Sequence, residues 1–139
     1  MEHWHIILWE NDDGVCLVDR DLLKKMRAKE KFLFETLGDK MGRYTEYPIE
    51  NVQHLHDLEK VKSEKNMWEL KFSLRKTEIR FLGCLVEKNG IKIFYALYAF
   101  KKKDQKIKDK HRETARARVG DFIKQHNQKY GPQRIFQEA

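Results

Sequence analysis

The residues with the most evident chemical potential are the basic ones in FKKKDQKIKDKHRETARARV, residues 100–119. Nine Lys and Arg side chains stand against three acidic ones there, which gives a local charge of +6 in a chain of formal net charge +7. Dense positive charge attracts polyanions such as RNA, with an affinity that falls as salt rises. The segment is therefore either the solvated side of a helix or the part of the chain that binds an anionic partner.

If the anionic partner is RNA, one reaction that basic side chains can support is cleavage without a metal, in which a 2′-OH attacks its own phosphate. Such a site must hold the phosphate, neutralise its charge and move protons. Arg80 is a candidate because a guanidinium matches phosphate, although it matches a carboxylate equally well. A two-residue turn at Asn89–Gly90 would pair Arg80 with Ala99 and place Arg80, Lys101 and Lys103 on one face of a sheet. A bulge would reverse half of this arrangement.

Other side chains could contribute to such a site. The same register places Tyr98 on the opposite face with Lys102, where its phenol could donate a proton, stack on a base or belong to the core. His111 could act as a general base, although a solvated histidine in the first turn of a helix is the simpler interpretation. The expected RNA-binding side chains are Arg75, Lys101, Lys102, Lys106 and Arg112. Lys101 and Lys103 could instead form a lysine-rich sheet edge that only discourages aggregation.

The elements that would position these residues follow from hydrophobic periodicity. Alternating or apolar runs predict strands at 4–10, 67–72, 77–88 and 91–100, and 3.6-residue spacing predicts helices over 21–42, with a break at 27–30, and over 109–129. Gly38 and Gly42 are expected to end the first helical region, and 43–66 should be a loop with a short helix near 54–61. This order predicts one α+β domain over 1–139, with two N-terminal helices and a C-terminal helix on a small antiparallel sheet.

Bulk features exclude several classes of protein. Cys16 and Cys84 match neither a redox nor a zinc spacing and are expected to be reduced. The pairs His3/His5 and His54/His56 lack further ligands, so no metal or other cofactor is expected. The longest apolar run, residues 93–100, is far shorter than a membrane span, and the N-terminus lacks the pattern of a signal peptide. A cytoplasmic protein without a membrane partner is predicted.

Four motifs in order resemble the RelE/ParE toxin superfamily, and more narrowly its HigB-like, phage-derived host-killing branch. They are MWELKF, the Arg-bearing strand EIRF, the strand end AFKKKDQK after an Asn-Gly hairpin, and the basic helix HRETARAR, which together cover about residues 67–119. Three positions depart from the family pattern: Tyr98 stands for a histidine, Ala99 for a glycine and Asp104 for a threonine.

The resemblance implies a RelE-like fold and a toxin that cleaves messenger RNA, usually on the ribosome. It implies catalytic roles for Arg80, Lys103 and Tyr98, and inhibition by a HigA-like helix-turn-helix antitoxin, through which alone the complex would contact DNA. Two alternatives stay open. One is a ParE-like gyrase poison with the same fold, and the other is a non-enzymatic module that binds nucleic acid or the ribosome.

Overall fold

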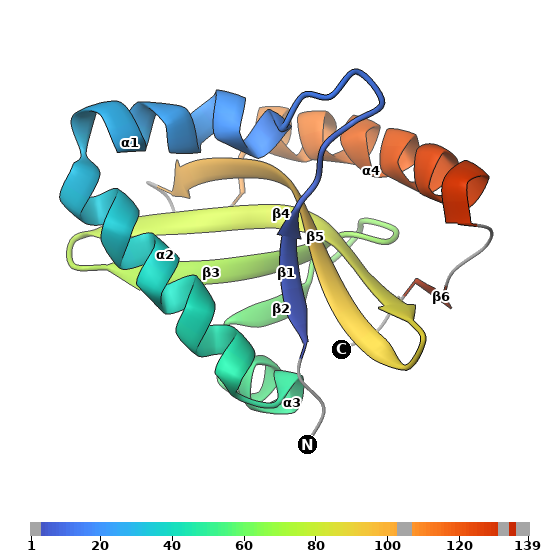
Figure 1. Cartoon of the computed structure of the whole chain (residues 1–139), viewed down its shortest axis with the longest axis horizontal. Coiled ribbons are helices and arrows are strands. Elements are labelled where there is room, and N and C mark those ends of the chain that lie inside the picture. Colours follow the sequence, from blue (N-terminus) through green and yellow to red (C-terminus); the bar gives the residue numbers. More distant parts are fainter. Residues whose placement is uncertain (1–3, 103–106, 131–133, 136–139) are drawn as a thin grey trace.

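A computed structural model describes residues 4–102, 107–130 and, for the backbone alone, 134–135 (Figure 1). The sheet has the strand order β1-β5-β4-β3-β2, and the short β6 pairs with β4. The strands are β1 His5–Leu8, β2 Leu58–Lys60, β3 Trp68–Leu74, β4 Thr77–Lys88, β5 Ile91–Lys102 and β6 Arg134–Ile135. All pairs are antiparallel except β1 with β5, so the predicted α+β class with a mostly antiparallel sheet is confirmed.

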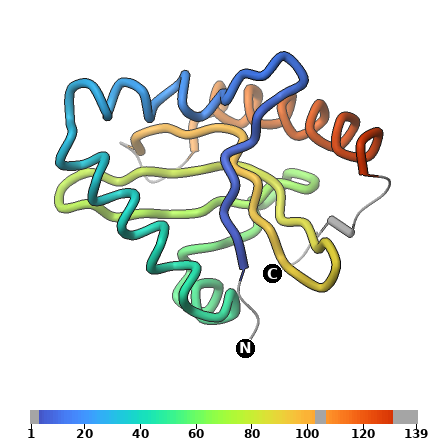
Figure 2. Tube along the Cα trace, in the orientation of Figure 1, coloured from blue at the N-terminus to red at the C-terminus, as the bar shows by residue number. Residues whose placement is uncertain are grey.

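The helices lie on both faces of this sheet. A π-helical turn η1, Asp19–Leu23, leads into α1, Lys24–Lys29, and α2, Lys31–Glu46, follows; α3 is Ile49–His54 and α4 is Asp109–Tyr130. The break predicted at 27–30 is confirmed, because Glu30 leaves helical geometry with φ −134° and ψ 55°. In the trace of Figure 2 the chain turns sharply at this point.

Two predictions about the helices are wrong. Gly38 and Gly42 do not end a helix, since α2 continues to Glu46. Each glycine costs a helix about 1 kcal/mol, and packing of Leu37, Met41 and Tyr44 on the sheet offsets that cost. The short helix expected near 54–61 is α3 at 49–54, and the residues after it form β2 instead.

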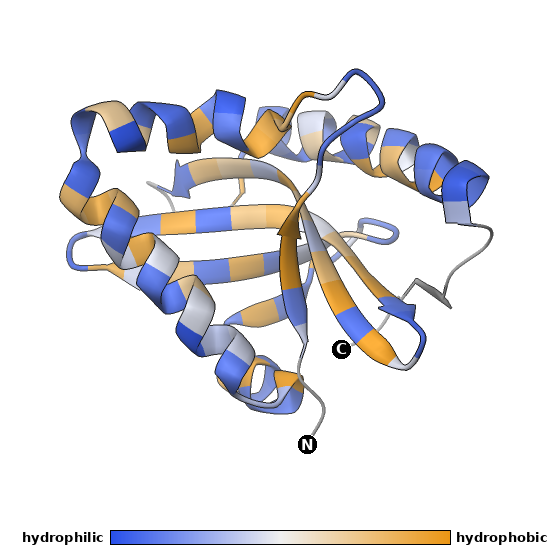
Figure 3. Cartoon of the chain, viewed as in Figure 1, coloured by the Kyte–Doolittle hydropathy of each residue, from blue (hydrophilic) through white to orange (hydrophobic). Residues whose placement is uncertain are grey.

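Apolar clusters lie on both faces of the sheet, which explains why the central strands read as nearly continuous hydrophobic runs (Figure 3). The face under η1, α1, α2 and α3 buries Phe72, Phe81 and Phe94. The face under α4 buries Leu82 and Cys84 together with residues such as Leu97, Phe100 and Phe122. Among the described residues no helix is long and apolar enough to cross a membrane.

A β-bulge decides which residues of β5 point to which face. The Asn89–Gly90 hairpin pairs Lys88 with Ile91 as predicted, but the register shifts between Leu82 and Gly83, so that Gly83 pairs with Ala96 and Leu82 with Tyr98. The extra residue turns two consecutive side chains, Leu97 and Tyr98, toward α4.

The bulge overturns the predicted arrangement of basic residues. Arg80 pairs with Phe100, not with Ala99, so it shares a face with Phe100 and Lys102. Lys101 points to the opposite face, and the prediction that it forms a cluster with Arg80 is wrong. Lys103, the third member of that cluster, lies outside the described residues.

Gly83 is required at this bulge by space and not by its dihedral angles. A Cβ atom at this position would lie 1.9 Å from the backbone oxygen of Tyr95 and 3.2 Å from the Cα of Ala96. Only glycine allows the two strands to approach this closely.

Candidate functional site

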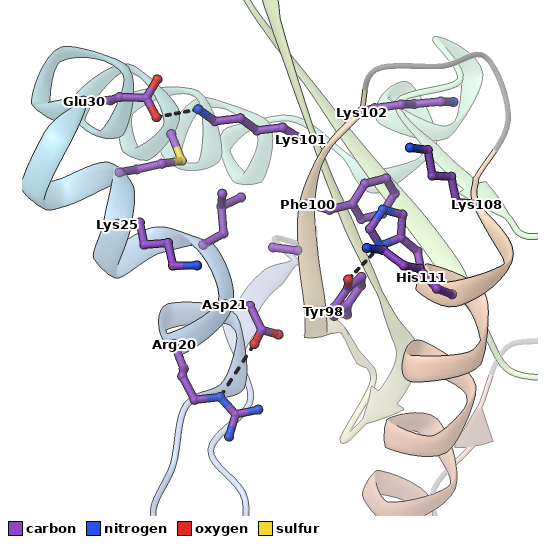
Figure 4. Close-up of a pocket in the computed structure, with 14 residues that line it drawn as sticks. Arg20, Asp21, Lys25, Glu30, Tyr98, Phe100, Lys101, Lys102, Lys108 and His111 are labelled. Atoms are coloured by element: carbon purple, nitrogen blue, oxygen red, sulfur yellow. Dashed lines mark hydrogen bonds and ion pairs between the residues drawn. The ribbon is translucent and has the colours of Figure 1, made fainter.

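A pocket of about 620 Å³ lies beside the last residues of β5 (Figure 4). Strand β1 pairs only with residues 93–96 of β5, so the edge beyond them is left open between η1 and α1 on one side and the start of α4 on the other. The lining side chains are those of Arg20, Asp21, Leu22, Lys25, Met26, Glu30, Tyr98, Ala99, Phe100, Lys101, Lys102, Lys108, Lys110 and His111.

Tyr98 and His111 meet in this pocket. The Tyr98 Oη and His111 Nδ1 atoms are 2.7 Å apart, a hydrogen bond whose direction depends on the imidazole tautomer. Burial lowers the pKa of His111, and the neighbouring Lys110 and Lys108 lower it further. Burial also raises the pKa of Tyr98, with a further contribution from Asp21. At neutral pH the pair therefore combines an unprotonated imidazole with a protonated phenol.

Stacking and ion pairing hold these two side chains in place. The ring of His111 stacks on Phe100, with centroids 4.2 Å apart and planes 15° from parallel. The Arg118 guanidinium lies 5.0 Å from the centre of the Tyr98 ring, donates to the Leu97 carbonyl at 2.9 Å and pairs with Asp21. The bulge residue, η1 and α4 are thus tied together around Tyr98.

The pocket is strongly basic. Six Lys and Arg side chains and two carboxylates line it, which leaves a charge of +4 when His111 is neutral. Glu30 forms an ion pair with Lys101, and Asp21 lies 3.6 Å from Arg20 (Figure 4). Such a surface favours an anion over a cation or a neutral ligand.

Arg80, the principal catalytic candidate from the sequence, is not part of this pocket. Its side chain is only 8% exposed, and its Nε atom lies 3.5 Å from Glu69 Oε2 while a terminal nitrogen lies 3.2 Å from Glu78 Oε2. In the structure Arg80 therefore contacts two carboxylates. This is the alternative to phosphate binding that the sequence analysis left open.

The other predicted residues are spread over the molecule. Lys101 and Lys102 line the pocket with Tyr98. Arg112 lies 3.8 Å from Glu64 and donates to the Lys62 carbonyl, and Arg75 lies over the Phe32 ring in the turn between β3 and β4. Lys106, like Lys103, lies outside the described residues.

Sequence reasoning missed the side of the pocket formed by Arg20, Asp21, Lys25 and Glu30. No sequence signal could pair these residues with Tyr98, which is about 70 positions away, because the contact depends on how α1 packs on the sheet. The position of Arg118 close to His111 could have been predicted, since Arg118 follows His111 by seven residues and lies on the same side of a helix.

The site offers no metal ligand set. Among the described residues no three His, Cys, Asp or Glu side chains gather closely enough to hold an ion. Proton transfer between side chains and charge neutralisation by lysines are the chemistry that the observed groups can supply.

Comparison with known proteins identifies the family. The family model described as "Phage derived protein Gp49-like (DUF891)" matches residues 22–120, which is more than half of the chain and includes Arg80, Tyr98 and His111. Comparisons with curated proteins and with solved structures gave no match. The phage-derived character that the sequence motifs indicate is confirmed, and the chain belongs to the phage-derived Gp49-like family.

Proposed function

We propose that this protein is the toxin of a type II toxin–antitoxin system and acts as a ribosome-dependent endoribonuclease on messenger RNA. One observation carries the proposal: the Tyr98–His111 pair lies in a basic pocket that is open to an anionic ligand. Membership of a phage-derived family is consistent with a toxin-like module. The narrower HigB-like assignment rests on the motif resemblance.

The reaction is an attack of a ribose 2′-oxygen on the adjacent phosphorus. The 2′-OH loses its proton, the new P–O2′ bond forms, and the P–O5′ bond breaks as the leaving oxygen gains a proton. The products are a 2′,3′-cyclic phosphate and a 5′-OH. Two proton transfers and a phosphorane of increased negative charge must be accommodated.

The pair is suited to both transfers. In the tautomer with a proton on Nδ1, His111 donates to Tyr98 Oη, which leaves its Nε2 lone pair free to accept the 2′-OH proton. The Tyr98 hydroxyl, whose pKa is raised, keeps its own proton for the leaving oxygen or a phosphate oxygen. In this assignment His111 is the general base and Tyr98 the acid.

Lysines of the pocket would neutralise the phosphorane. Lys102 and Lys108 lie on the side of the pocket nearest His111 (Figure 4), and Lys110, which also lines the pocket, directly precedes His111 in the chain. Lys101 is held by Glu30 and could exchange this carboxylate for phosphate. No residue of this mechanism requires a metal.

The partners follow from the same resemblance. The substrate would be messenger RNA on the ribosome in the cytoplasm, and a helix-turn-helix antitoxin would hold the toxin inactive. Contact with DNA would occur only through the toxin–antitoxin complex.

The proposal is tested by expressing wild type, Tyr98→Phe and Tyr95→Phe in cells and mapping the 5′ ends of messenger RNA during growth. Tyr95 is a matched control, because it lies on the same strand and contacts a histidine of α4, His126, outside the pocket. We expect arrest and new 5′-OH ends for wild type and Tyr95→Phe, and a loss of cleavage on the order of 10²-fold or more for Tyr98→Phe.

Arrest without new RNA ends would overturn the nuclease proposal. It would favour the ParE-like gyrase poison or the non-enzymatic ribosome-binding module. The enclosure of Arg80 by Glu69 and Glu78 is the one observation in favour of the non-enzymatic alternative, because it removes a guanidinium from the groups available to a phosphate.

A further inference from the structure

An exposed aromatic ring, that of Phe32, contacts the guanidinium of Arg75 at the end of the sheet next to the pocket. Phe32, in the first turn of α2, is a large aromatic side chain that is 59% exposed. The Arg75 guanidinium lies over its ring, 4.7 Å from the centroid. Helix α2 and the β3–β4 turn, which are distant in sequence, come together at this point (Figure 1).

The surface around this pair is basic. Lys29, Lys31 and Lys76 are exposed close to Phe32 and Arg75 in the chain, and the nearest exposed carboxylates in sequence are those of Glu35 and Glu78. Basic side chains interleaved with an exposed aromatic ring are typical of surfaces that bind single-stranded nucleic acid. A hydrophobic contact with a protein partner would not require this density of cations.

The surface is also continuous with the pocket. Glu30 lines the pocket and pairs with Lys101, and Phe32 follows it by only two residues. Strand β4 begins at Thr77, just after the turn that contains Arg75. Its second residue, Glu78, lies opposite Lys102 in the β4–β5 register, and Lys102 lines the pocket. An RNA chain bound in the pocket would therefore pass next to Phe32 if it left the pocket on the α1 side.

Arg75 has φ +52°, in the left-handed region that glycine and asparagine occupy at lower cost. The arginine supplies the turn with a cation placed over Phe32, which a better turn residue would not.

We propose that Phe32 and Arg75 form a stacking subsite for an unpaired base of a single-stranded RNA that continues from the pocket. The base stacks against the aromatic–guanidinium pair, and Lys31 and Lys76 attract the flanking phosphates. This inference rests on the proposed RNA substrate and adds to it the requirement for a single strand and a contact remote from the reacting phosphate.

The test measures binding of a fluorescent 2′-O-methyl oligoribonucleotide, which lacks the attacking hydroxyl and cannot be cleaved. Wild type, Phe32→Ala, Arg75→Gly and Tyr47→Ala are compared by anisotropy, with denaturation curves for each. Tyr47 is a matched control, since it is 57% exposed just beyond the opposite end of α2. Arg75→Gly removes the guanidinium while relieving the left-handed strain, so lower stability cannot account for weaker binding.

We expect Phe32→Ala and Arg75→Gly to raise the dissociation constant about fivefold or more, the lower range for loss of one stacked base, while Tyr47→Ala leaves it unchanged. A duplex of the same sequence should bind Phe32→Ala and wild type equally, because its bases are already stacked.

Unchanged single-strand binding in Phe32→Ala would overturn the subsite and would leave the patch to a protein partner. The outcome is separable from that of the nuclease proposal. Wild type that binds the uncleavable strand through Phe32 yet never cuts RNA would refute the reaction and keep the subsite.

Discussion

Replacing Arg80 by alanine should destabilise the fold, whatever it does to activity. Arg80 is 8% exposed and Glu69 is 10% exposed, and the Nε and Oε2 atoms that face each other at 3.5 Å are both buried. Neither atom makes a hydrogen bond within the part of the chain that the structure describes. Glu78, the second carboxylate, is 47% exposed and can be solvated without Arg80.

The magnitude follows from what remains after the substitution. Alanine leaves the Glu69 carboxylate buried without a cation, and breaking a buried pair from one side costs about 3–5 kcal/mol. This is a large part of the roughly 5–15 kcal/mol that stabilises a typical domain. The double variant Glu69→Gln/Arg80→Met removes both charges at similar volume, so it should lose much less than the sum of the single losses.

Chemical denaturation of wild type, Arg80→Ala, Glu69→Gln and the double variant measures these differences. Wild-type stability in Arg80→Ala would refute the reasoning, because it would show that Glu69 does not depend on this partner. The double variant also decides the role that the sequence assigned to Arg80. Growth arrest with RNA cleavage by a folded double variant would make Arg80 structural, and a folded but inactive one would support a phosphate contact.

Three further predictions concern the scaffold of the site. Gly83→Ala should destabilise the fold by more than about 2 kcal/mol, because its Cβ would lie 1.9 Å from a backbone oxygen, whereas Gly120→Ala, with open space in α4, should stabilise it by about 0.5–1 kcal/mol in thermal denaturation. Burial and then Lys88 lower the pKa of His126 below its ordinary 6.5, so the unfolded chain binds this proton more tightly and the fold loses stability as pH falls below about that value. His126→Phe should therefore flatten the stability profile there, and it should gain about 1 kcal/mol at neutral pH by removing a buried Nε2 without a partner among the described residues. Hydrogen bonds from Arg116 lower the pKa of Glu64 below its ordinary 4.5, so this pair stabilises the protein above about pH 4.5 and the stabilisation is lost as pH falls further. Glu64→Gln should therefore be less stable than wild type at neutral pH, and its stability should fall less steeply as the solution is acidified.

Much of the secondary structure could be predicted from the sequence because it depends on local patterns. The strands of the meander, the Asn89–Gly90 hairpin, the bend near Glu30 and the C-terminal helix all follow from periodicity and turn chemistry. The errors occurred where tertiary packing outweighed a local preference, as when α2 continues through two glycines.

The candidate site could be predicted only in part. The sequence identified the basic segment, Tyr98, Lys101 and Lys102, and it raised His111 as an alternative. The sequence could not predict that Tyr98 and His111 lie together. The bulge at Gly83 shifts the alternation of side chains along β5 by one residue and thereby turns Tyr98 toward α4 and His111.

The sequence by itself determined the fold class, the concentration of positive charge at residues 100–119 and the family to which the chain belongs, since all three depend on composition and on motifs close together in the chain. The tertiary structure alone decided that Arg80 faces Glu69 and that residues of η1 and α1 complete a pocket with β5 and α4. The physical reason is that strand register and helix docking depend on contacts between distant residues, and a shift of one residue exchanges the two faces of a strand.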